Sequence, residues 1–346
     1  MPRGWSDVSD SPAVNIMNPP DSPMTTSVPA STLVPRVEAC VAWSLCICVI
    51  LGTLARYLGR WHWAFELTTH FVVQATALAG LATLLLLVRR HWRFSLIAGL
   101  LTVVNAAEWV PFYSLKSLTS FASDHTKLEV VSVNVYSRNR HSADLHRWLK
   151  ETRADVIFLS EVDSWWADQI GSWKEDWPHQ ILDPHEDNFG LALISRHPII
   201  DTHLFQLDGL NPAVDCRIQT PGGDWTIVGL HPFPPIGRAY SALRNQQLTS
   251  AAKHIATLPK PRVVLGDLNS TSCSPLFQDF QAATGLVDSR EGFGWQPTWP
   301  AGNSLLRIPI DHCLVEPGVQ VLDRHVGPDI GSDHLPVRAR LIRRQK

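Results

Sequence analysis

Side chains that could activate water, hold a cation or move a proton stand where apolar stretches of this sequence end. Glu161 directly follows the stretch 155–160, and Asp267 and Asn269 follow the stretch 263–266 in the pattern Gly-Asp-Leu-Asn. A layered fold presents functional groups at its strand ends, and carboxylates and imidazoles suit acid–base work and the binding of cations. The other residues in such positions are Asn134, His231, Asp311, His312, Asp333 and His334.

Each of these residues alone has a plainer interpretation. An Asn at a strand end usually forms a turn, a Glu after a strand is usually solvated, and a lone His is more often structural than catalytic. The combination is more specific, because a Gly-Asp-x-Asn and a Ser-Asp-His both end apolar stretches, downstream of the Asn and the Glu. The set therefore predicts one site built from several strand ends.

The elements that must position these side chains alternate along residues 128–341. Branched apolar residues predict a strand at 128–135, and Leu145 and Leu149, four residues apart, predict a helix over 142–152. Strands outnumber helices and no glycine-rich phosphate loop follows the first strand, which indicates a layered α/β arrangement and excludes a dinucleotide-binding fold. Further strands are expected at 155–160, 191–195, 225–231, 262–266, 308–315 and 335–341, and a further helix at 241–258.

The first third of the chain has a different character. Residues 1–36 hold seven prolines and six serines and are predicted to be a disordered tail. Three apolar stretches follow at about 37–55, 71–88 and 94–113, and each approaches the ~20 residues that cross a ~30 Å hydrocarbon layer. The sequence thus predicts three transmembrane helices and a linker over 114–126, and it disfavours the alternative of a buried hairpin in a soluble protein.

Basic residues predict the orientation of these spans. Arg89, Arg90 and Arg93 lie between the second and third spans, so that loop is expected in the cytoplasm and residues 114–346 outside it. Arg56 and Arg60, which follow the first span, argue the other way. The predicted location is the cell membrane, multi-pass, with an extracytoplasmic C-terminal domain, and an interfacial position is expected for Glu108, near the end of the third span.

Composition excludes several classes of protein. The chain has 346 residues, 45% hydrophobic and 18% charged, with 30 Lys and Arg against 32 Asp and Glu. These values exclude a disordered chain, a coiled coil and a strongly basic nucleic-acid binder. Residues 114–346 hold 23 basic and 26 acidic residues, so the missing charge lies in the apolar stretches. The six cysteines form no C-x-x-C pair and indicate no zinc finger.

Seven short motifs carry a resemblance to a known family: Val131-Ser-Val-Asn134, Leu159-Ser-Glu161, Gly190-Leu-Ala-Leu-Ile-Ser195, Gly229-Leu-His231, Gly266-Asp-Leu-Asn269, Ile310-Asp-His312 and Gly331-Ser-Asp-His334. In this order they resemble the endonuclease/exonuclease/phosphatase superfamily of deoxyribonuclease I, abasic-site endonucleases, bacterial sphingomyelinases and inositol-polyphosphate 5-phosphatases. The resemblance covers about residues 127–343, and the segment 294–300 resembles a bacterial membrane-anchored branch. It implies a four-layer α-β-β-α sandwich over 127–346, with the site at one edge of the two sheets.

The resemblance also implies a bound Mg²⁺ or Mn²⁺. Glu161 corresponds to the main metal ligand, with Asn134 close by and Asp333 as a possible second carboxylate. Magnesium prefers oxygen ligands and keeps most of its waters, so one or two carboxylates suffice. The sequence leaves open whether one ion or two are bound.

Five residues take the remaining roles that the resemblance implies. Asp267 would orient and deprotonate the attacking water, and Asn269 would hold that water or a phosphate oxygen. His334 would contact the phosphate, with Asp311 fixing its tautomer, and His231 would donate a proton to the leaving oxygen. His312 is interpreted as structural, because neighbouring side chains on a strand point to opposite faces.

The sequence predicts a membrane-anchored phosphoesterase without choosing its substrate. The partners expected are the lipid bilayer and a phosphoester in a nucleic acid, a nucleotide or a phospholipid; no protein partner is inferred. The near-neutral domain argues against tight binding to a DNA duplex. An inactive receptor or scaffold on the same fold is the main alternative, disfavoured because every reacting residue is present. A small transporter finds support only in Glu38 and Glu108.

Overall fold

The computed structural model describes residues 30–114 and 127–343. By its internal contacts the chain divides into two compact units, Met1–Val41 and Ala42–Lys346. Residues 1–29 of the predicted tail and 115–126 of the predicted linker lie outside the described residues.

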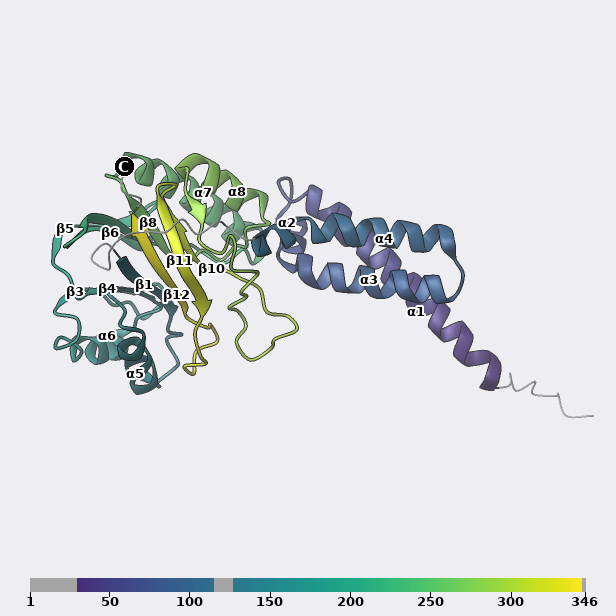
Figure 1. The fold of residues 1–346 in the computed structure, drawn as a ribbon, viewed down its shortest axis with the longest axis horizontal. Coiled ribbons are helices and arrows are strands. Elements are labelled where there is room, and N and C mark those ends of the chain that lie inside the picture. Colours follow the sequence, from purple (N-terminus) through teal and green to yellow (C-terminus); the bar gives the residue numbers. More distant parts are fainter. Residues whose placement is uncertain (1–29, 115–126, 344–346) are drawn as a thin grey trace, which may run out of the picture. The chain divides into compact units, whose positions relative to one another are not determined.

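Two six-stranded sheets form the centre of the second unit (Figure 1). The first has the order β11-β12-β1-β2-β4-β3 and consists of β1 (Lys127–Asn134), β2 (Val156–Ser160), β3 (His179–Asp183), β4 (Leu191–Ser195), β11 (Val319–Val326) and β12 (Val337–Arg343). The second has the order β5-β6-β7-β8-β10-β9 and consists of β5 (Ile199–Leu207), β6 (Asn211–Thr220), β7 (Gly223–Gly229), β8 (Arg262–Asp267), β9 (Val287–Asp288) and β10 (Asp311–Val315).

The two sheets pack face to face through a continuous apolar core. Val130, Phe158 and Leu193 of the first sheet lie in one buried cluster with Ile227 and Leu265 of the second. The packing is close, because a Cβ atom built at Gly229 would lie 2.2 Å from the Phe158 ring. A glycine in β7 is therefore required for the sheets to approach this far.

Helices cover the two outer faces and complete the four predicted layers. α5 (Ser142–Thr152) and α6 (Ser164–Gly171) pack on the first sheet, and α7 (Gly237–Thr257) and α8 (Pro275–Thr284) pack on the second. Figure 1 shows both pairs with the strands between them. The predicted sandwich is thus confirmed.

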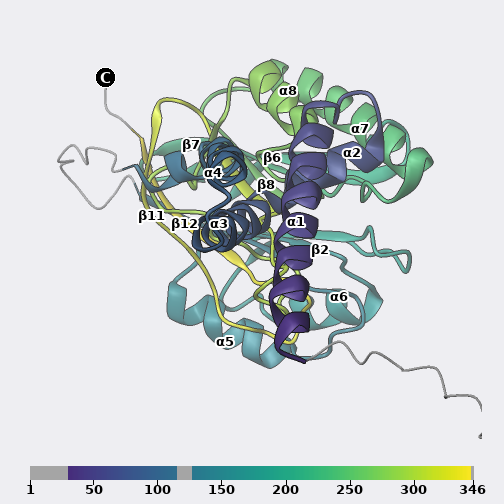
Figure 2. The ribbon, with the colours of Figure 1, turned by 90° about the vertical axis from the view of Figure 1, so that its right-hand side faces the viewer.

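A helical segment precedes the sheets. Its elements are α1 (Ala30–Tyr57), α2 (Trp63–Leu67), a 3-10 turn (Thr68–Phe71), α3 (Val72–Val88), α4 (Trp92–Ala106) and a second 3-10 turn (Val110–Tyr113). α3 and α4 pack side by side (Figure 2). Within the described part of the chain, the helical stretch Trp63–Val88 is the one that is both long and apolar enough to cross a membrane, and Trp43–Tyr57 and Trp92–Ala106 are shorter apolar helices.

Two boundaries of this segment correct the sequence prediction. α1 begins at Ala30, inside the predicted tail 1–36, because six of the seven prolines in that stretch precede Ala30. The third predicted span, 94–113, is α-helical only to Ala106 and ends in the 3-10 turn Val110–Tyr113. Glu108, beyond Ala106, lies 3.3 Å from Arg56 in an ion pair, and Pro111 lacks the N–H that a continued helix needs.

Candidate active site

The parallel pairing of β1 and β2 brings the first two predicted residues together. Asn134 pairs in register with Ser160, so Glu161 emerges beside it. The Asn134 side-chain nitrogen donates to Glu161 Oε1 at 2.9 Å, and the Asn134 oxygen accepts from the Tyr136 N–H at 3.0 Å. Asn134 therefore presents a donor to Glu161, and its predicted direct contact with a metal ion stays a prediction.

The second sheet contributes two aspartates that face each other across paired strands. Asp267 ends β8 and Asp311 begins β10, and the two residues are partners in the antiparallel register. Gly266 precedes Asp267 with a φ of +144°, and a Cβ atom there would lie 1.9 Å from the Leu230 carbonyl oxygen. The backbone therefore requires glycine at position 266 of the motif, since a residue with a Cβ atom does not fit there.

His334 joins the two aspartates into one buried group. Its Nδ1 donates to Asp311 Oδ2 at 2.9 Å, and its Nε2 lies 3.6 Å from Asp267 Oδ2. Although burial opposes the charged ring, the carboxylates of Asp311 and Asp267 raise the pKa of His334 to about 10. The ring is therefore held as a cation that presents Nε2 to the site.

The two aspartates respond to these surroundings in opposite directions. Burial, with the charges of Asp311 and Glu161, raises the pKa of Asp267 to about 7. Burial opposes ionisation of Asp311 too, but the adjacent His334 outweighs it and lowers the pKa of Asp311. Asp311 is thus the permanent counter-ion of His334, while Asp267 lies at the pKa that suits a base near neutral pH.

His231 completes the ring of groups around Asp267. Its Nε2 lies 3.7 Å from Asp267 Oδ2, and its ring contacts Phe189. Burial and the nearby His334 cation lower the pKa of His231 to about 4, so the ring is neutral in the free protein. Asn269 lies on the other side, where its N–H donates to Asp267 Oδ1 at 2.8 Å.

The donor set fits a divalent cation on the Glu161 side of the site. Asp333 Oδ1 is buried without a hydrogen-bond partner among the described residues, and its Oδ2 accepts from the Trp299 indole at 3.2 Å. Burial raises the pKa of Glu161, and the negative charge of Asp333 raises it further. The hydrogen bond from Asn134 acts in the opposite direction but does not cancel the rise. Two confined carboxylates of this kind are the hard oxygen ligands that Mg²⁺ or Mn²⁺ prefers.

These groups form the floor of a cavity of about 590 Å³. Six of the predicted residues line it, namely Glu161, His231, Asp267, Asn269, Asp333 and His334. Asn134 and Asp311 lie directly behind them and contact Glu161 and His334. The structure therefore brings all eight predicted site residues together.

Three other residues of interest lie elsewhere. His312 Nε2 donates to the Ser270 carbonyl at 2.7 Å, which agrees with its structural interpretation. Asp163 is buried and caps α6 by accepting from the Trp166 N–H at 2.8 Å. Trp166 of α6 is fully buried in the core under the first sheet.

The sequence reasoning missed the wall of the cavity. Leu67, His70 and Phe71, from the end of α2 and the turn before α3, line it together with residues of the sheet domain. The signal was available, because polar residues including Glu66 and His70 interrupt the apolar stretches at this point.

Buried polar contacts attach that wall to the sheet domain. Glu66 forms an ion pair with Arg244 and accepts from the Ser274 hydroxyl at 2.7 Å. His70 Nδ1 lies 3.1 Å from Thr271 Oγ1, two residues after Asn269. The wall is therefore fixed to the loop that carries the predicted water-activating residues.

Comparisons with known proteins agree with this architecture. The sequence model of the "Endonuclease/Exonuclease/phosphatase family" matches residues 131–334, and no curated protein matches the chain. Similar solved structures include an endonuclease/exonuclease/phosphatase from Beutenbergia cavernae, with 21% identity, a TM-score of 0.52, and coverage of 63% of this chain and 72% of that chain. The mannosyl-6-phosphatase of Bacteroides thetaiotaomicron has 20% identity, a TM-score of 0.53, and coverage of 62% and 99%. A beta-toxin variant from Staphylococcus aureus with bound magnesium ions has 19% identity, a TM-score of 0.50, and the same coverage. These likenesses show the fold.

Proposed function

The chain belongs to the endonuclease/exonuclease/phosphatase family, whose members are hydrolases of phosphoester bonds, and we propose that it is a membrane-anchored, divalent-metal-dependent phosphodiesterase. The observation that carries the proposal is the convergence on Asp267 Oδ2 of Asn134 Nδ2 at 3.3 Å, His334 Nε2 at 3.6 Å and His231 Nε2 at 3.7 Å. A buried carboxylate surrounded by donors on the floor of a cavity is suited to orient and deprotonate one water molecule.

Glu161 and Asp333 are the residues that would hold the ion. The hydrogen bond from Asn134 fixes Glu161 Oε1, and the Trp299 indole fixes Asp333 Oδ2. Glu161 Oε2 accepts a longer hydrogen bond of 3.4 Å from the Ser137 N–H, and Asp333 Oδ1 has no hydrogen-bond partner among the described residues, so these two oxygens would take the ion. A bound divalent cation would polarise a phosphoryl oxygen and offset the charge that develops there. The magnesium ions in the beta-toxin structure support this choice of ion.

The remaining residues act on the proton and the charge. Asp267 takes the proton of the attacking water, at a pKa of about 7 that balances basicity against ionisation. The His334 cation, held by Asp311, stabilises the negative charge that grows on the phosphoryl oxygens. His231 lies beside the leaving oxygen and donates a hydrogen bond to it, and Asn269 orients Asp267 through its backbone N–H.

Turnover of bis(4-nitrophenyl) phosphate by the full chain tests this mechanism. Replacing Asp267 by Asn should lower kcat by about 10²–10⁴-fold, since that is the usual contribution of a positioned general base. Asp144→Asn is a matched control, because Asp144 is half exposed on α5 and pairs with Arg147 one turn away. Activity that survives Asp267→Asn, or that persists in a chelator, would contradict the mechanism.

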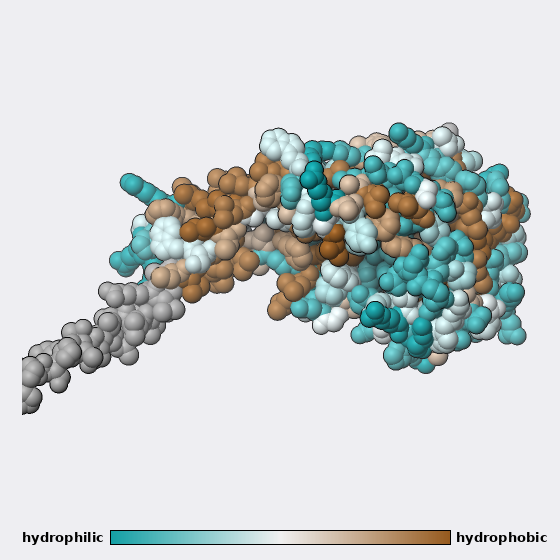
Figure 3. Space-filling view, turned by 180° about the vertical axis from the view of Figure 1, so that it is seen from behind, coloured by the Kyte–Doolittle hydropathy of each residue, from teal (hydrophilic) through white to brown (hydrophobic). Residues whose placement is uncertain are grey.

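Membrane anchoring by the helical segment is supported by which of its residues face outward. Small side chains are buried where α3 meets α4, among them Ala79, Ala82 and Ala98. Asn105 donates to the Thr53 hydroxyl at 2.9 Å inside the segment. Large apolar side chains are exposed instead, namely Leu78, Leu81, Leu84, Leu87, Phe94, Leu96, Ile97, Leu100 and Val103. Figure 3 shows this apolar surface in brown, and small or polar interfaces with apolar exteriors are typical of helices packed in lipid.

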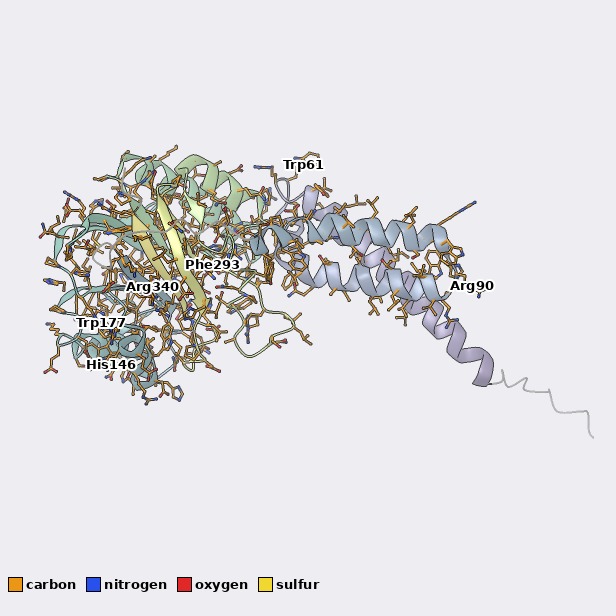
Figure 4. All side chains as sticks on the ribbon, viewed as in Figure 1. Trp61, Arg90, His146, Trp177, Phe293 and Arg340 are labelled. Atoms are coloured by element: carbon orange, nitrogen blue, oxygen red, sulfur yellow. The ribbon has the colours of Figure 1, made fainter. Side chains whose placement is uncertain are left out.

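The charges near the segment support a multi-pass topology with the sheet domain outside the cytoplasm. Arg90 lies at the turn between α3 and α4, at the other end of the segment from Trp61 (Figure 4). On the Trp61 side, Arg56 pairs with Glu108 and Arg60 pairs with Asp279. Three arginines, Arg89, Arg90 and Arg93, lie at the α3–α4 turn against two on the Trp61 side, so the count of basic residues favours an extracytoplasmic domain. A C-terminal tag should be accessible in intact cells, and protection of that tag would overturn this orientation.

A further inference from the structure

The helical segment forms part of the active-site wall and also leads directly into the membrane helix. Phe71 lines the cavity, and the next residue, Val72, begins the largely apolar 17-residue helix α3. One helical turn rises about 5.4 Å. If α3 lies in the bilayer, as we propose above, the cavity therefore opens within about one or two turns of the hydrocarbon edge.

Exposed apolar side chains surround this opening. Phe71 and Ile236 line the cavity and are exposed to solvent. Leu305 and Leu306, 82% and 52% exposed, lie on the loop that connects the cavity-lining residues Trp299 and Ile308. We call Phe71, Ile236, Leu305 and Leu306 the apolar rim. Isolated exposed leucines are ordinary, but four large apolar side chains around one opening indicate a binding surface.

A hydrogen bond fixes part of the rim against the membrane helix. Gln74, one turn after Phe71 on α3, donates through Nε2 to the Leu305 carbonyl at 3.1 Å and lies 3.3 Å from the Arg307 carbonyl. The loop is thus held beside the first turn of α3. Leu305 and Leu306 therefore lie where the sheet domain would face the lipid headgroups.

Two kinds of residue line the cavity. Glu161, Asp267, Asp333 and His334 are titratable, and beside them lies an apolar and aromatic group made of Phe189, Phe233, Pro234, Pro235, Ile236 and Tyr240. The Phe233 ring stacks on Tyr240 with centroids 5.2 Å apart and contacts Phe189 at 4.9 Å. Such a site suits a molecule with a charged end and an apolar end.

The lining also argues against a nucleic-acid substrate. Of the described residues around the cavity, none is a lysine or an arginine. Nucleic-acid binding depends on several basic side chains that contact successive phosphates. The same lining is compatible with a single phosphodiester that carries an apolar tail.

We infer that the substrate is a membrane-resident lipid phosphodiester, whose head enters the cavity while its tail lies over the apolar rim. This inference rests on the proposed phosphodiesterase function and on the membrane position of α3. It predicts that the protein distinguishes two phosphodiesters that differ only in their tails.

Two synthetic substrates with the same leaving group test the inference. 4-Nitrophenyl methyl phosphate is soluble, and 4-nitrophenyl hexadecyl phosphate partitions into phosphatidylcholine vesicles that hold the reconstituted full chain. The long-tailed substrate should be hydrolysed at least about 100-fold faster, as kcat/KM, because each buried methylene contributes several-fold. Equal rates would overturn the inference and leave the phosphodiesterase function intact.

Variants of the rim separate its contribution from simple partitioning into the vesicle. The double substitution L305S/L306S should reduce the ratio of long-tailed to short-tailed turnover by about tenfold or more, whereas partitioning of the substrate is unaffected by the protein's sequence. Leu204→Ser is the matched control. Leu204 on β5 is 46% exposed, close to the 52% of Leu306, and it is not one of the residues that line the cavity. An unchanged ratio in L305S/L306S would refute the role of the rim.

A binding measurement keeps this inference distinct from the function on which it rests. The Asp267→Asn protein, titrated with non-hydrolysable hexadecyl and methyl phosphonates, should prefer the hexadecyl compound by the same factor, and L305S/L306S should remove that preference. If neither nitrophenyl substrate is hydrolysed by the unmodified protein, the proposed function fails. If they are hydrolysed but the phosphonates bind equally well, only the lipid inference fails.

Discussion

Breaking the ion pair between Glu66 and Arg244 tests whether the helical segment is a structural part of the active site. The two side chains are 1% and 0% exposed, and Arg244 also donates to the Asn269 carbonyl at 3.4 Å. Replacing Glu66 by Leu leaves a guanidinium buried without a carboxylate. The free energy of unfolding should therefore fall by about 3–5 kcal/mol, the usual cost of removing one partner from a buried pair.

Arg60 and Asp279 form a natural comparison for this prediction. They also join the helical segment to the sheet domain, but both side chains are 53% exposed. An exposed pair contributes at most about 1 kcal/mol, so Asp279→Ala should change the free energy of unfolding little. The difference between Glu66→Leu and Asp279→Ala isolates the effect of burial.

Chemical unfolding of the full chain in detergent micelles, followed by tryptophan fluorescence, measures both variants. The double variant Glu66→Leu with Arg244→Leu should recover part of the loss, because removing both charges of a buried pair is often neutral. The kcat of Glu66→Leu should also fall, since Arg244 holds the backbone of the Asn269 loop. Equal stabilities of Glu66→Leu and Asp279→Ala would refute the reasoning, and so would a fragment of residues 127–346 as active as the full chain.

Two further predictions concern buried charges elsewhere in the sheet domain. Asp311→Asn removes the counter-ion of His334, so kcat should fall by about 10²-fold or more while the KM for bis(4-nitrophenyl) phosphate changes less. Burial opposes ionisation of Asp288, but the Arg290 guanidinium holds the pKa of that carboxyl well below its usual range. A carboxyl whose pKa is lowered on folding stabilises the folded state above its unfolded pKa of about 4 and loses that contribution below it. Asp288→Asn should therefore be strongly destabilising at pH 7. The difference in the free energy of unfolding between this variant and the unmodified protein, measured with urea, should shrink as the pH falls below about 4. A difference that grows on acidification would contradict this assignment.

How far the sequence predicts the fold depends on the position of each strand in its sheet. β1, β2, β4 and β8 lie inside the sheets, and their residues form apolar stretches with almost uniformly buried side chains. β3, β5, β9 and β11 are edge strands, and the sequence analysis did not find them. β5 illustrates the cause, because most of its side chains are exposed and it carries polar residues where a buried strand would be apolar.

The missed inner strand has a different explanation. β6 lies second in its sheet, but Pro212, Asp215 and Arg217 interrupt its apolar pattern. Asp215 is bonded by His254 of α7 at 2.7 Å and by His203 of β5 at 3.2 Å. Partners contributed by a distant helix and a neighbouring strand satisfy the buried polar group, and no local pattern of sequence contains that information.

The predicted residues of the active site differ from the missed ones in their role and in their position in the chain. The eight predicted residues are reacting groups or their direct partners, and all lie within or at the end of the family match, residues 131–334. Leu67, His70 and Phe71 lie outside it and contact the substrate cavity through apolar or neutral surfaces. The reaction requires particular residue types among the reacting groups, so these residues can be recognised in a sequence. A cavity wall needs only a suitable shape, which many apolar residues can provide. The helical segment therefore contributes to the part of the site that selects the substrate, together with the apolar rim residues of the sheet domain. Exchanging Leu67 and Phe71 should alter substrate preference while the metal-binding and water-activating residues remain unchanged.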